Sequence, residues 1–533
     1  MRHRLARQVN RATRLSVALC LMAVPFPLRP AENANSSPPA QVEITVDTGK
    51  IVNTMRGGIG ASWHAIEQPI PIGHGGSGWG AYPPAEDDRA WQQIYRHASW
   101  LGLDWNRVEI EQRIYEPELN RFTFDSPEMR ILDRILDWNQ KNNTDVFFQQ
   151  MWANTAWSAY PESRDDPIKR VHSAPRDLDA FANGLATLME YLIKKRGYTC
   201  IKWLSITNEP GSNWSWWQGP SGEPLTIGPG LTAVRKALAQ HGLNLPLSGP
   251  DSGIEVFHAA MKPEDESLLG AYDFHDYSIR IDANSAGYLE KQARDISTRT
   301  RSAHDQGKPL FMSEFGSIDL AVFSVAPADL RPDKPEPILA ASEFVIRDAN
   351  AGVDGFNRWS FLNRGDLDGL WQFVDTWDTK QKKLLPEFTP HENSYFGLGL
   401  LSRFTAKHSA VLATNVSEAQ VKGWQRIYCA AFRSPNGNVT LAVVNDAPVE
   451  FALKLAWAGT PPPERFFRYR YSTQQYDRLD VKVDPEPGFS PAPASAWTDS
   501  LPPNSLTIYS TYKLTHDDPG ILVDDSRDRT LRP

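Results

Sequence analysis

The sequence predicts a (β/α)8 barrel, or TIM barrel, followed by an antiparallel β-sandwich. Eight short apolar runs alternate with helical patterns over roughly the first 390 residues, and eight alternating strand–helix units close into a barrel of parallel strands. Beyond that point the pattern contains strands only, which is typical of a sandwich. No glycine-rich dinucleotide fingerprint follows the first strand, which argues against an open, doubly wound sheet.

The barrel strands are expected where apolar and β-branched residues cluster, at residues 57–63, 105–110, 145–151, 202–207, 246–249, 272–277, 309–315 and 355–360. Helices are expected between them, at 91–101, from 126 onward, at 178–195 and at 338–350. Ser126 followed by Pro127 is a favourable helix start, because serine caps the first turn and proline suits the first helical position. Residues 67–86 are rich in Gly and Pro and predict a long loop.

The sandwich strands are expected at 409–414, 427–433, 439–444, 451–457, 466–471 and 506–512, with a hairpin turn at 435–438. Residues 41–46 alternate polar and apolar and are expected to complete the sandwich. The predicted organisation is a leader at 1–34, a linker and N-terminal strand at 35–50, a barrel at 51–390, a sandwich at 391–516 and a disordered tail at 517–533.

The N-terminus has the features of a secretory signal, so we expect a secreted or periplasmic protein. Five arginines precede an apolar run at 15–26 that is too short to span a membrane, and Ala31 and Ala34 are small residues suited to cleavage. The alternative is an uncleaved anchor. Removing residues 1–34 takes away six Arg and one Glu and moves the net charge from −8 to −13. This acidic balance argues against nucleic acid or a membrane surface as partner; we expect a monomer.

Two cysteines remain after the leader, Cys200 and Cys429, and both lie in apolar surroundings. They are predicted to be buried free thiols rather than a disulfide. No His-x-His or His-Glu-x-x-His spacing occurs, so no metal and no cofactor is expected.

Two of the predicted barrel strands end in a glutamate. An apolar run leads to Glu209, where Pro210 interrupts the strand, and a second run leads to Glu314, with Gly316 after it. Function in a barrel lies at the C-terminal ends of the strands. Two carboxyl groups there are what glycoside hydrolysis uses, because one protonates the leaving oxygen while the other attacks or activates water. The sequence therefore predicts a glycoside hydrolase.

These motifs resemble glycoside hydrolase clan A, the retaining β-glycosidases on a (β/α)8 barrel. Asn208-Glu209-Pro210 is similar to the clan's fourth-strand motif and Ser313-Glu314-Phe315-Gly316 to its seventh-strand motif. Four further positions match the clan, namely Arg107 on the second strand, His275 and Tyr277 on the sixth and Trp359 on the eighth. A barrel followed by a sandwich with a shared N-terminal strand is similar to families 30 and 39.

The resemblance implies double displacement at a β-glycosidic bond, with Glu209 as acid/base and Glu314 as nucleophile. Retention then predicts carboxyl groups about 5 to 5.5 Å apart, a raised pKa at Glu209 and an ionised Glu314. Asn208 is expected to donate to the sugar 2-hydroxyl, or alternatively to cap a turn. Arg107 and Tyr277 are expected to hydrogen-bond Glu314, although Arg107 could instead form an ion pair in the barrel core.

The remaining predicted roles concern substrate binding. The resemblance implies that the Trp359 ring forms the floor of the subsite that binds the cleaved sugar. His275 is expected to form hydrogen bonds at that subsite or in the barrel core. Several tryptophans in loops are expected to form sugar platforms suited to an oligo- or polysaccharide, with packing within the loops as the alternative for each: Trp152, Trp157, Trp214, Trp216, Trp217 and Trp371. The alternatives are a non-catalytic carbohydrate-binding barrel and a metal-dependent barrel hydrolase.

Overall fold

The computed structural model describes residues 39–64, 70–71, 78–79, 82–211, 216–253, 261–277, 288–316, 337–362, 372–378, 380–391, 395–421, 424–476, 478–479, 481–489, 491 and 496–514. The predicted leader at 1–34, the predicted tail at 517–533 and much of the predicted loop at 67–86 lie outside these ranges. None of the described helices is both long and apolar enough to cross a membrane.

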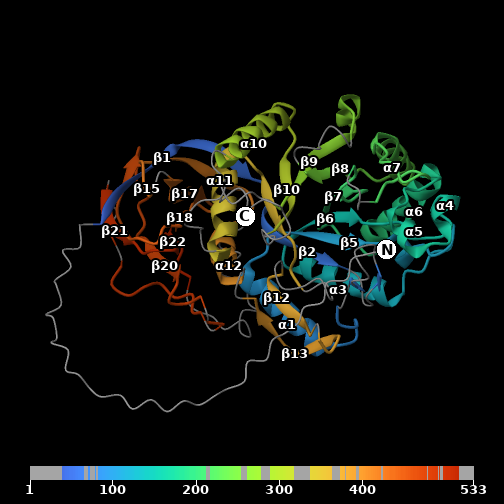
Figure 1. Cartoon of the computed structure of the whole chain (residues 1–533), viewed down its shortest axis with the longest axis horizontal. Helices are drawn as coiled ribbons and strands as arrows, with labels where there is room; N and C mark the ends of the chain where they lie inside the picture. The colour runs from blue at the N-terminus through green and yellow to red at the C-terminus, as the bar shows by residue number, and fades with distance from the viewer. Residues whose placement is uncertain are drawn as a thin grey trace, which may run out of the picture. The chain divides into compact units, whose positions relative to one another are not determined.

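Eight parallel strands form a closed barrel, as the sequence predicts (Figure 1). In chain order around the barrel they are β2 (Gly58–His64), β5 (Trp105–Ile110), β6 (Asp145–Gln150), β7 (Ile201–Ser205), β8 (Leu247–Gly253), β9 (Leu269–Asp276), β10 (Leu310–Phe315) and β11 (Gly355–Arg358), and β11 pairs with β2 to close the ring. Every one of the eight predicted strand positions is therefore confirmed.

The interior of the barrel is filled by aromatic rings rather than left open. Trp105, Phe147 and Phe311 are fully buried there together with Ala271, and Trp203 packs against them. The Trp105 backbone comes so close to β2 that a Cβ built on Gly60 would lie 1.4 Å from the Trp105 carbonyl oxygen. Because this interior is filled with apolar side chains, polar groups can gather at the C-terminal ends of the strands.

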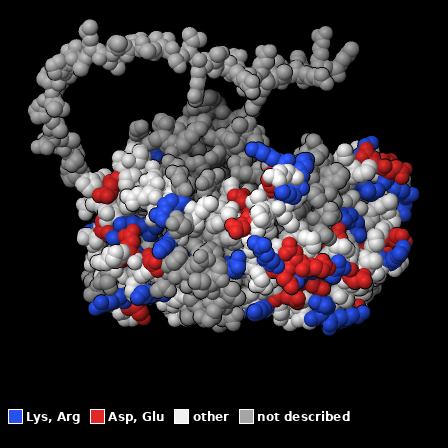
Figure 2. Space-filling view, turned by 90° about the horizontal axis from the view of Figure 1, so that it is seen from below, with Lys and Arg blue, Asp and Glu red and all other residues white. Residues whose placement is uncertain are grey.

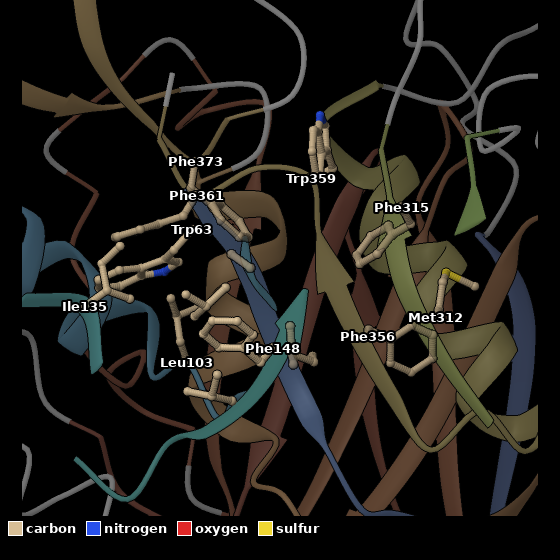
Figure 3. Close-up of a cluster of buried hydrophobic side chains, with 14 of the residues drawn as sticks. Trp63, Leu103, Ile135, Phe148, Met312, Phe315, Phe356, Trp359, Phe361 and Phe373 are labelled. Carbon is tan, nitrogen blue, oxygen red and sulfur yellow. The ribbon is translucent and has the colours of Figure 1, made fainter. Parts of the chain in front are cut away.

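Helices surround the barrel: α1 (Asp88–Leu101), α3 (Pro127–Lys141), α6 (Leu178–Glu190), α7 (Gly228–Gln240), α10 (Tyr288–Asp305) and α11 (Pro337–Ala351). The helix predicted to start at Ser126 is confirmed, because the Ser126 side chain accepts from the Met129 N–H and Pro127 is the first helical residue. An apolar layer joins helices and strands (Figure 3). In it the Trp63 ring stacks on Phe361 at 4.8 Å and on Trp138 at 5.4 Å.

The second part of the molecule is one continuous eight-stranded sheet in the order β20-β22-β18-β17-β14-β1-β19-β21. Its strands are β1 (Ala40–Met55), β14 (Ser409–Val416), β17 (Ile427–Arg433), β18 (Val439–Asn445), β19 (Phe451–Ala458), β20 (Phe467–Ser472), β21 (Ala496–Leu501) and β22 (Ser505–Ser510). Rings from opposite ends of this order meet, with Trp497 of β21 and Tyr509 of β22 5.1 Å apart. The sheet therefore folds over one apolar core, as a sandwich does.

The N-terminal strand β1 lies in the middle of this sheet rather than at its edge. It runs antiparallel to β14 and parallel to β19, and the β1–β19 pair is the only parallel one in the sheet among the described strands. The strand predicted at 41–46 is thus part of a longer element. The sheet contacts the barrel through its helices, since the Asn350 amide of α11 donates to the Cys429 carbonyl at 2.9 Å.

The remaining elements are short: β3 (Ile70–Pro71), β4 (Gly78–Trp79), β12 (Val374–Asp378), β13 (Lys383–Pro390), β15 (Gln420–Val421), β16 (Trp424–Gln425), α2 (Gln112–Tyr115), α4 (Pro161–Arg164), α5 (Pro167–His172), the π-helical η1 (Tyr191–Lys195), the 3-10 helix η3 (Pro263–Leu268) and α12 (Tyr395–Phe404). Cys200 and Cys429 are buried free thiols, as predicted. Figure 2 shows basic and acidic side chains interspersed over the visible face, without a broad field of Lys and Arg alone.

Candidate active site

The backbone at the end of β7 places Glu209 by means of a neighbouring strand. Glu209 has φ +47°, and Asp251 in β8 has φ +59°, a left-handed region that residues other than glycine seldom occupy. The Glu209 N–H donates to the Asp251 carbonyl oxygen at 2.7 Å. Holding two such residues costs free energy, so this cross-strand hydrogen bond marks a region whose conformation the fold determines firmly.

The two glutamates predicted from the sequence meet at the same end of the barrel. His275 of β9 lies between them, with its Nδ1 2.6 Å from Glu209 Oε1 and 3.3 Å from Glu314 Oε2. One carboxylate oxygen of each glutamate and one ring nitrogen of His275 all lie within 4.8 Å of one another. Glu209 is 9% exposed and Glu314 3%, so the pair is close together and largely shielded from water.

Arg107 of β5 is buried beside this pair, and every one of its five N–H groups donates a hydrogen bond. Nε donates to Gln149 at 3.3 Å, Nη1 to Glu109 and Glu314, and Nη2 to Asn208 at 2.8 Å and Asp251 at 3.1 Å. A guanidinium has no further donors. Arg107 therefore forms ion pairs in the barrel core, which was the alternative, and it also makes the predicted contact to Glu314.

The other predicted residues also lie at this end of the barrel. The Tyr277 hydroxyl donates to Glu314 Oε2 at 2.6 Å. The Trp359 ring is buried, with the Arg107 guanidinium 5.6 Å from its centroid. Asn208 uses its oxygen for Arg107, while its amide nitrogen has no hydrogen-bond partner among the residues that the structure describes.

Burial is the main cause of the raised pKa values of the two glutamates. It raises the pKa of Glu209 to about 7, against the hydrogen bond and charge of His275, which favour the carboxylate. Burial also raises the pKa of Glu314, opposed by the charges of Arg107 and His275. The raised pKa predicted at Glu209 is thus found, and the charge of Glu314 adds to it less than burial does.

Asp251 is the most important residue of the cluster that sequence reasoning missed. Its carboxylate is fully buried and contacts His275 Nε2 at 2.8 Å, Arg107 and the Gln149 amide. Although burial opposes it, the charges of Arg107 and His275 lower the pKa of Asp251 to about 2. A usable signal was present, because Asp251 comes two positions after the short run predicted at 246–249, with Pro250 between them.

Two further residues extend the polar cluster around Arg107. Glu109 accepts from Arg107 and forms an ion pair with His64 Nδ1. The His64 ring meets Trp359 edge to face at 5.1 Å. Glu109 and Arg107 are two positions apart on β5 and therefore face the same side of the strand. That spacing could have identified Glu109 as a neighbour of Arg107.

The expectation of tryptophan platforms is wrong for two of the named residues. Trp216 and Trp217 are buried and meet the Phe181 ring edge to face, and a Cβ on Gly230 would lie 2.4 Å from Trp217. Both therefore pack against α6 and α7. Trp152 is 3% exposed, and Trp157 is half-buried and donates from Nε1 to a backbone carbonyl. Trp214 and Trp371 lie outside the described residues.

The spacing of Glu209, His275 and Glu314 alone would also suit a bound cation. The surrounding contacts favour a cluster that balances its charge without one. Both His275 nitrogens already face carboxylates, at 2.6 and 2.8 Å. Arg107 contacts Glu314 directly, and its positive charge opposes a cation at the same carboxylate.

Comparisons with solved structures find this fold elsewhere. A family 30 subfamily 8 xylanase of Clostridium acetobutylicum has a TM-score of 0.58 and 15% identity, covering 88% of this chain and 99% of its own. A conserved exported protein of Bacteroides fragilis has a TM-score of 0.60 and 12% identity, with 88% and 99% covered. A family 51 α-L-arabinofuranosidase of Thermotoga petrophila has a TM-score of 0.55 and 13% identity, with 88% and 100% covered.

At these identities the likeness establishes the fold. Barrel and folded sheet are both matched, because each of the three structures is covered almost completely. Family 30 is one of the two families suggested by the barrel followed by a sandwich with a shared N-terminal strand. Scans against models of protein families and against curated protein sequences find no match.

Proposed function

We propose that this protein is a retaining glycoside hydrolase that cleaves β-glycosidic bonds by double displacement. The observation that carries the proposal is the meeting of Glu209 and Glu314, with one oxygen of each within 4.8 Å of the other. Retaining enzymes keep their two carboxyl groups about 5 to 5.5 Å apart, whereas inverting enzymes leave roughly 6.5 Å or more for a water molecule. The shared fold of glycoside hydrolases from families 30 and 51 supports the proposal.

In the first step Glu314 attacks the anomeric carbon. One carboxylate oxygen forms the new C–O bond while the glycosidic bond breaks, and Glu209 gives its proton to the departing oxygen. Arg107 and Tyr277 both donate to Glu314, so they orient the nucleophile and favour its charged form. The raised pKa of Glu209, about 7, leaves a substantial fraction of this carboxyl protonated near neutral pH, which the acid role requires.

In the second step Glu209, now a carboxylate, takes a proton from water as the water oxygen attacks the anomeric carbon. The bond to Glu314 breaks and both carboxyl groups return to their starting states. The His275 ring lies 2.6 Å from Glu209 Oε1, where a positive charge stabilises the carboxylate between the two steps. The Asn208 amide nitrogen, which has no hydrogen-bond partner among the described residues, is suited to the sugar 2-hydroxyl.

The substrate proposed is an oligo- or polysaccharide. Among proteins of this fold, one is described as a xylanase, one as an α-L-arabinofuranosidase and one as an endo-β1,6-glucanase. We propose a secreted or periplasmic location on the basis of the arginine-rich and apolar N-terminus. The net charge of −8 and the mixed charges in Figure 2 fit a neutral sugar partner better than a nucleic acid.

The test is a screen of purified protein against β-glucans, xylans, mannans, galactans and aryl β-glycosides, followed by Glu314→Gln on the best substrate. We expect Glu314→Gln to lower turnover by several orders of magnitude, because no glycosyl-enzyme can form. Glu118→Gln is the matched control, since that side chain is 67% exposed. Sugar binding without bond cleavage would favour the non-catalytic alternative, and loss of activity in EDTA would favour a metal-dependent hydrolase.

A further inference from the structure

Asp251 has no role in the proposed reaction so far, although it is among the best-connected residues of the site. Its Oδ1 lies 2.8 Å from His275 Nε2 and accepts from Ser313 at 3.3 Å, while its Oδ2 accepts from Arg107 at 3.1 Å and Gln149 at 2.7 Å. The side chain is 0% exposed. Asp251 therefore acts through its neighbours and does not touch the substrate.

The backbone of Asp251 is fixed as firmly as its side chain. Its N–H donates to Asp273 Oδ1 at 2.7 Å, and Asp273 in turn accepts from the Ser248 hydroxyl at 2.9 Å. Its carbonyl oxygen accepts from the Glu209 N–H. One residue thus holds the backbone of Glu209 on one side and the ring of His275 on the other.

His275 connects Asp251 to the proposed acid. Its Nε2 faces Asp251 and its Nδ1 faces Glu209 Oε1 at 2.6 Å. The charged or titratable groups around the ring are Glu209, which follows β7, Asp251 of β8, Glu314 of β10 and, beyond these carboxyl groups, Arg107 and Tyr277. Carboxylates face both ring nitrogens, which favours a doubly protonated, positively charged ring.

We propose that Asp251 is a positioning residue that, through His275, holds the acidic proton of Glu209 on Oε2. This inference rests on the proposed function and deepens it. Asp251 receives N–H groups from Arg107 and Gln149 and is ionised, so it can only accept, and His275 Nε2 must carry a proton. The Asp251 charge then keeps a second proton on Nδ1.

The consequence for Glu209 follows from the hydrogen-bond directions. A protonated Nδ1 donates to Oε1, so Oε1 is an acceptor and the acidic proton belongs on Oε2. That proton moves from Oε2 to the glycosidic oxygen when the bond breaks, while His275 and Asp251 keep theirs. Without the Asp251 charge, Nδ1 loses its proton, becomes an acceptor and draws the Glu209 proton to Oε1, away from the leaving group.

The electrostatics of the cluster agree with this arrangement. Burial lowers the pKa of His275, but the charges of Glu314 and Asp251 and the hydrogen bonds to Asp251 and Glu209 raise it well above its ordinary value. Asp251 itself remains a strong acid, with a pKa of about 2. The geometry places a carboxyl oxygen at each ring nitrogen, and these charges favour a proton on both nitrogens.

The first test measures the protonation of His275 by NMR on protein labelled with 15N-histidine. We expect both ring nitrogens of wild-type His275 to carry protons from about pH 5 to 8, a range in which an ordinary histidine titrates. The ring signals of His275 are assigned as the set that is missing from the spectrum of His275→Gln. A wild-type His275 with a bare Nδ1 near pH 6 would overturn the inference without any variant of Asp251.

The second test removes the charge with Asp251→Asn, which preserves shape. We expect the His275 pKa to fall into the titrating range, while the circular dichroism spectrum stays native. Asp354→Asn is the matched control, because Asp354 is a buried carboxylate 2.7 Å from His304 Nε2 and does not contact His275. A His275 that stays fully protonated in Asp251→Asn would contradict the proposal.

The third test compares leaving groups on the best substrate of the screen. A general acid contributes roughly 100-fold or more, so Asp251→Asn should lower kcat/KM about 100-fold for a sugar leaving group. For dinitrophenolate, which needs no proton, the loss should be under about tenfold. Equal losses would show that Asp251 acts on Glu314 through Arg107 instead. If Glu314→Gln stays active, the proposed function fails, whereas the NMR result stands on its own.

Discussion

Glu209 is the residue whose ionisation sets the expected pH dependence. Burial raises its pKa to about 7, and the acid must be protonated in the free enzyme. We therefore expect kcat/KM to decline as the pH rises through about 7, measured as a full pH profile on the best substrate. A dinitrophenyl glycoside is the control, because its departure needs no proton and this decline should disappear. A profile for sugar leaving groups that stays flat to pH 9 would contradict the assignment.

Arg107 is the residue on which the charge balance of the site depends. Lysine has three donors where arginine has five, so Arg107→Lys leaves at least two of the five buried acceptors without their hydrogen bond from residue 107. Each such group costs about 1–3 kcal/mol, and we expect a lower midpoint in urea unfolding together with a loss of roughly 100-fold or more in kcat/KM. Arg121→Lys is the control, since its side chain is 67% exposed. Near-normal activity and stability of Arg107→Lys would contradict this role.

Individual residues of the site could be predicted only where a local motif carried them. Glu209 and Glu314 end apolar runs, and His275 and Tyr277 form a recognisable pair. Asp251 was missed because its importance comes from contacts with Arg107 and His275, which lie 144 and 24 positions away. Such partners become visible only when the barrel brings the strand ends together.

At the scale of the element, the closest packing in the barrel is between β2 and β5. A methyl group on Gly60 would fall 1.4 Å from the Trp105 carbonyl oxygen, so Gly60→Ala must push the two strands apart. We expect a loss of roughly 1–3 kcal/mol or more in the free energy of unfolding, measured in denaturant. Gly49→Ala is the control, because its added carbon would meet only the Asp47 side chain, at an ordinary 3.4 Å. Equal stability of the two variants would contradict this packing.

The elements themselves were largely predictable because each buried strand is a compact apolar run. Strands that are only partly buried have a weaker apolar pattern and are harder to predict. β21 (Ala496–Leu501) was not anticipated, since it is mostly half-exposed and includes Asp499. β1 proved far longer than the predicted 41–46, because beyond Asp47 its register shifts against β14 and the alternation of polar and apolar residues is lost. The tryptophans after β7 were misjudged because composition cannot distinguish packing from sugar binding.

At the scale of the whole molecule, β1 holds the folded sheet together. It separates β14 from β19 and pairs with both. We expect a chain shortened to begin at residue 56 to lose cooperative thermal unfolding, since its sheet would divide between those two strands. A chain that begins at Pro39 is the control and should melt like the full chain. A sharp, unchanged transition without β1 would show that the sheet does not need it.

The arrangement of the whole was predictable in outline, from the switch between alternating and strand-only patterns near residue 390. The continuous order of the sheet was not, because it depends on which distant strands pair. Three solved structures with at most 15% identity share the fold over 88% of this chain. A fold that is shared at such low sequence identity depends more on the spacing of apolar residues than on which apolar residue stands at each position.

The central place of β1 also has a consequence for biosynthesis. The Glu43 N–H bonds to Ser417 across 374 positions, and at about 5 to 20 residues per second the ribosome needs roughly 20 to 75 seconds to deliver that partner. During this interval the nascent strand has two open edges on which another molecule could aggregate. Glu43, Asp47 and Lys50 place charges along it, which discourages such premature association until its own neighbours arrive.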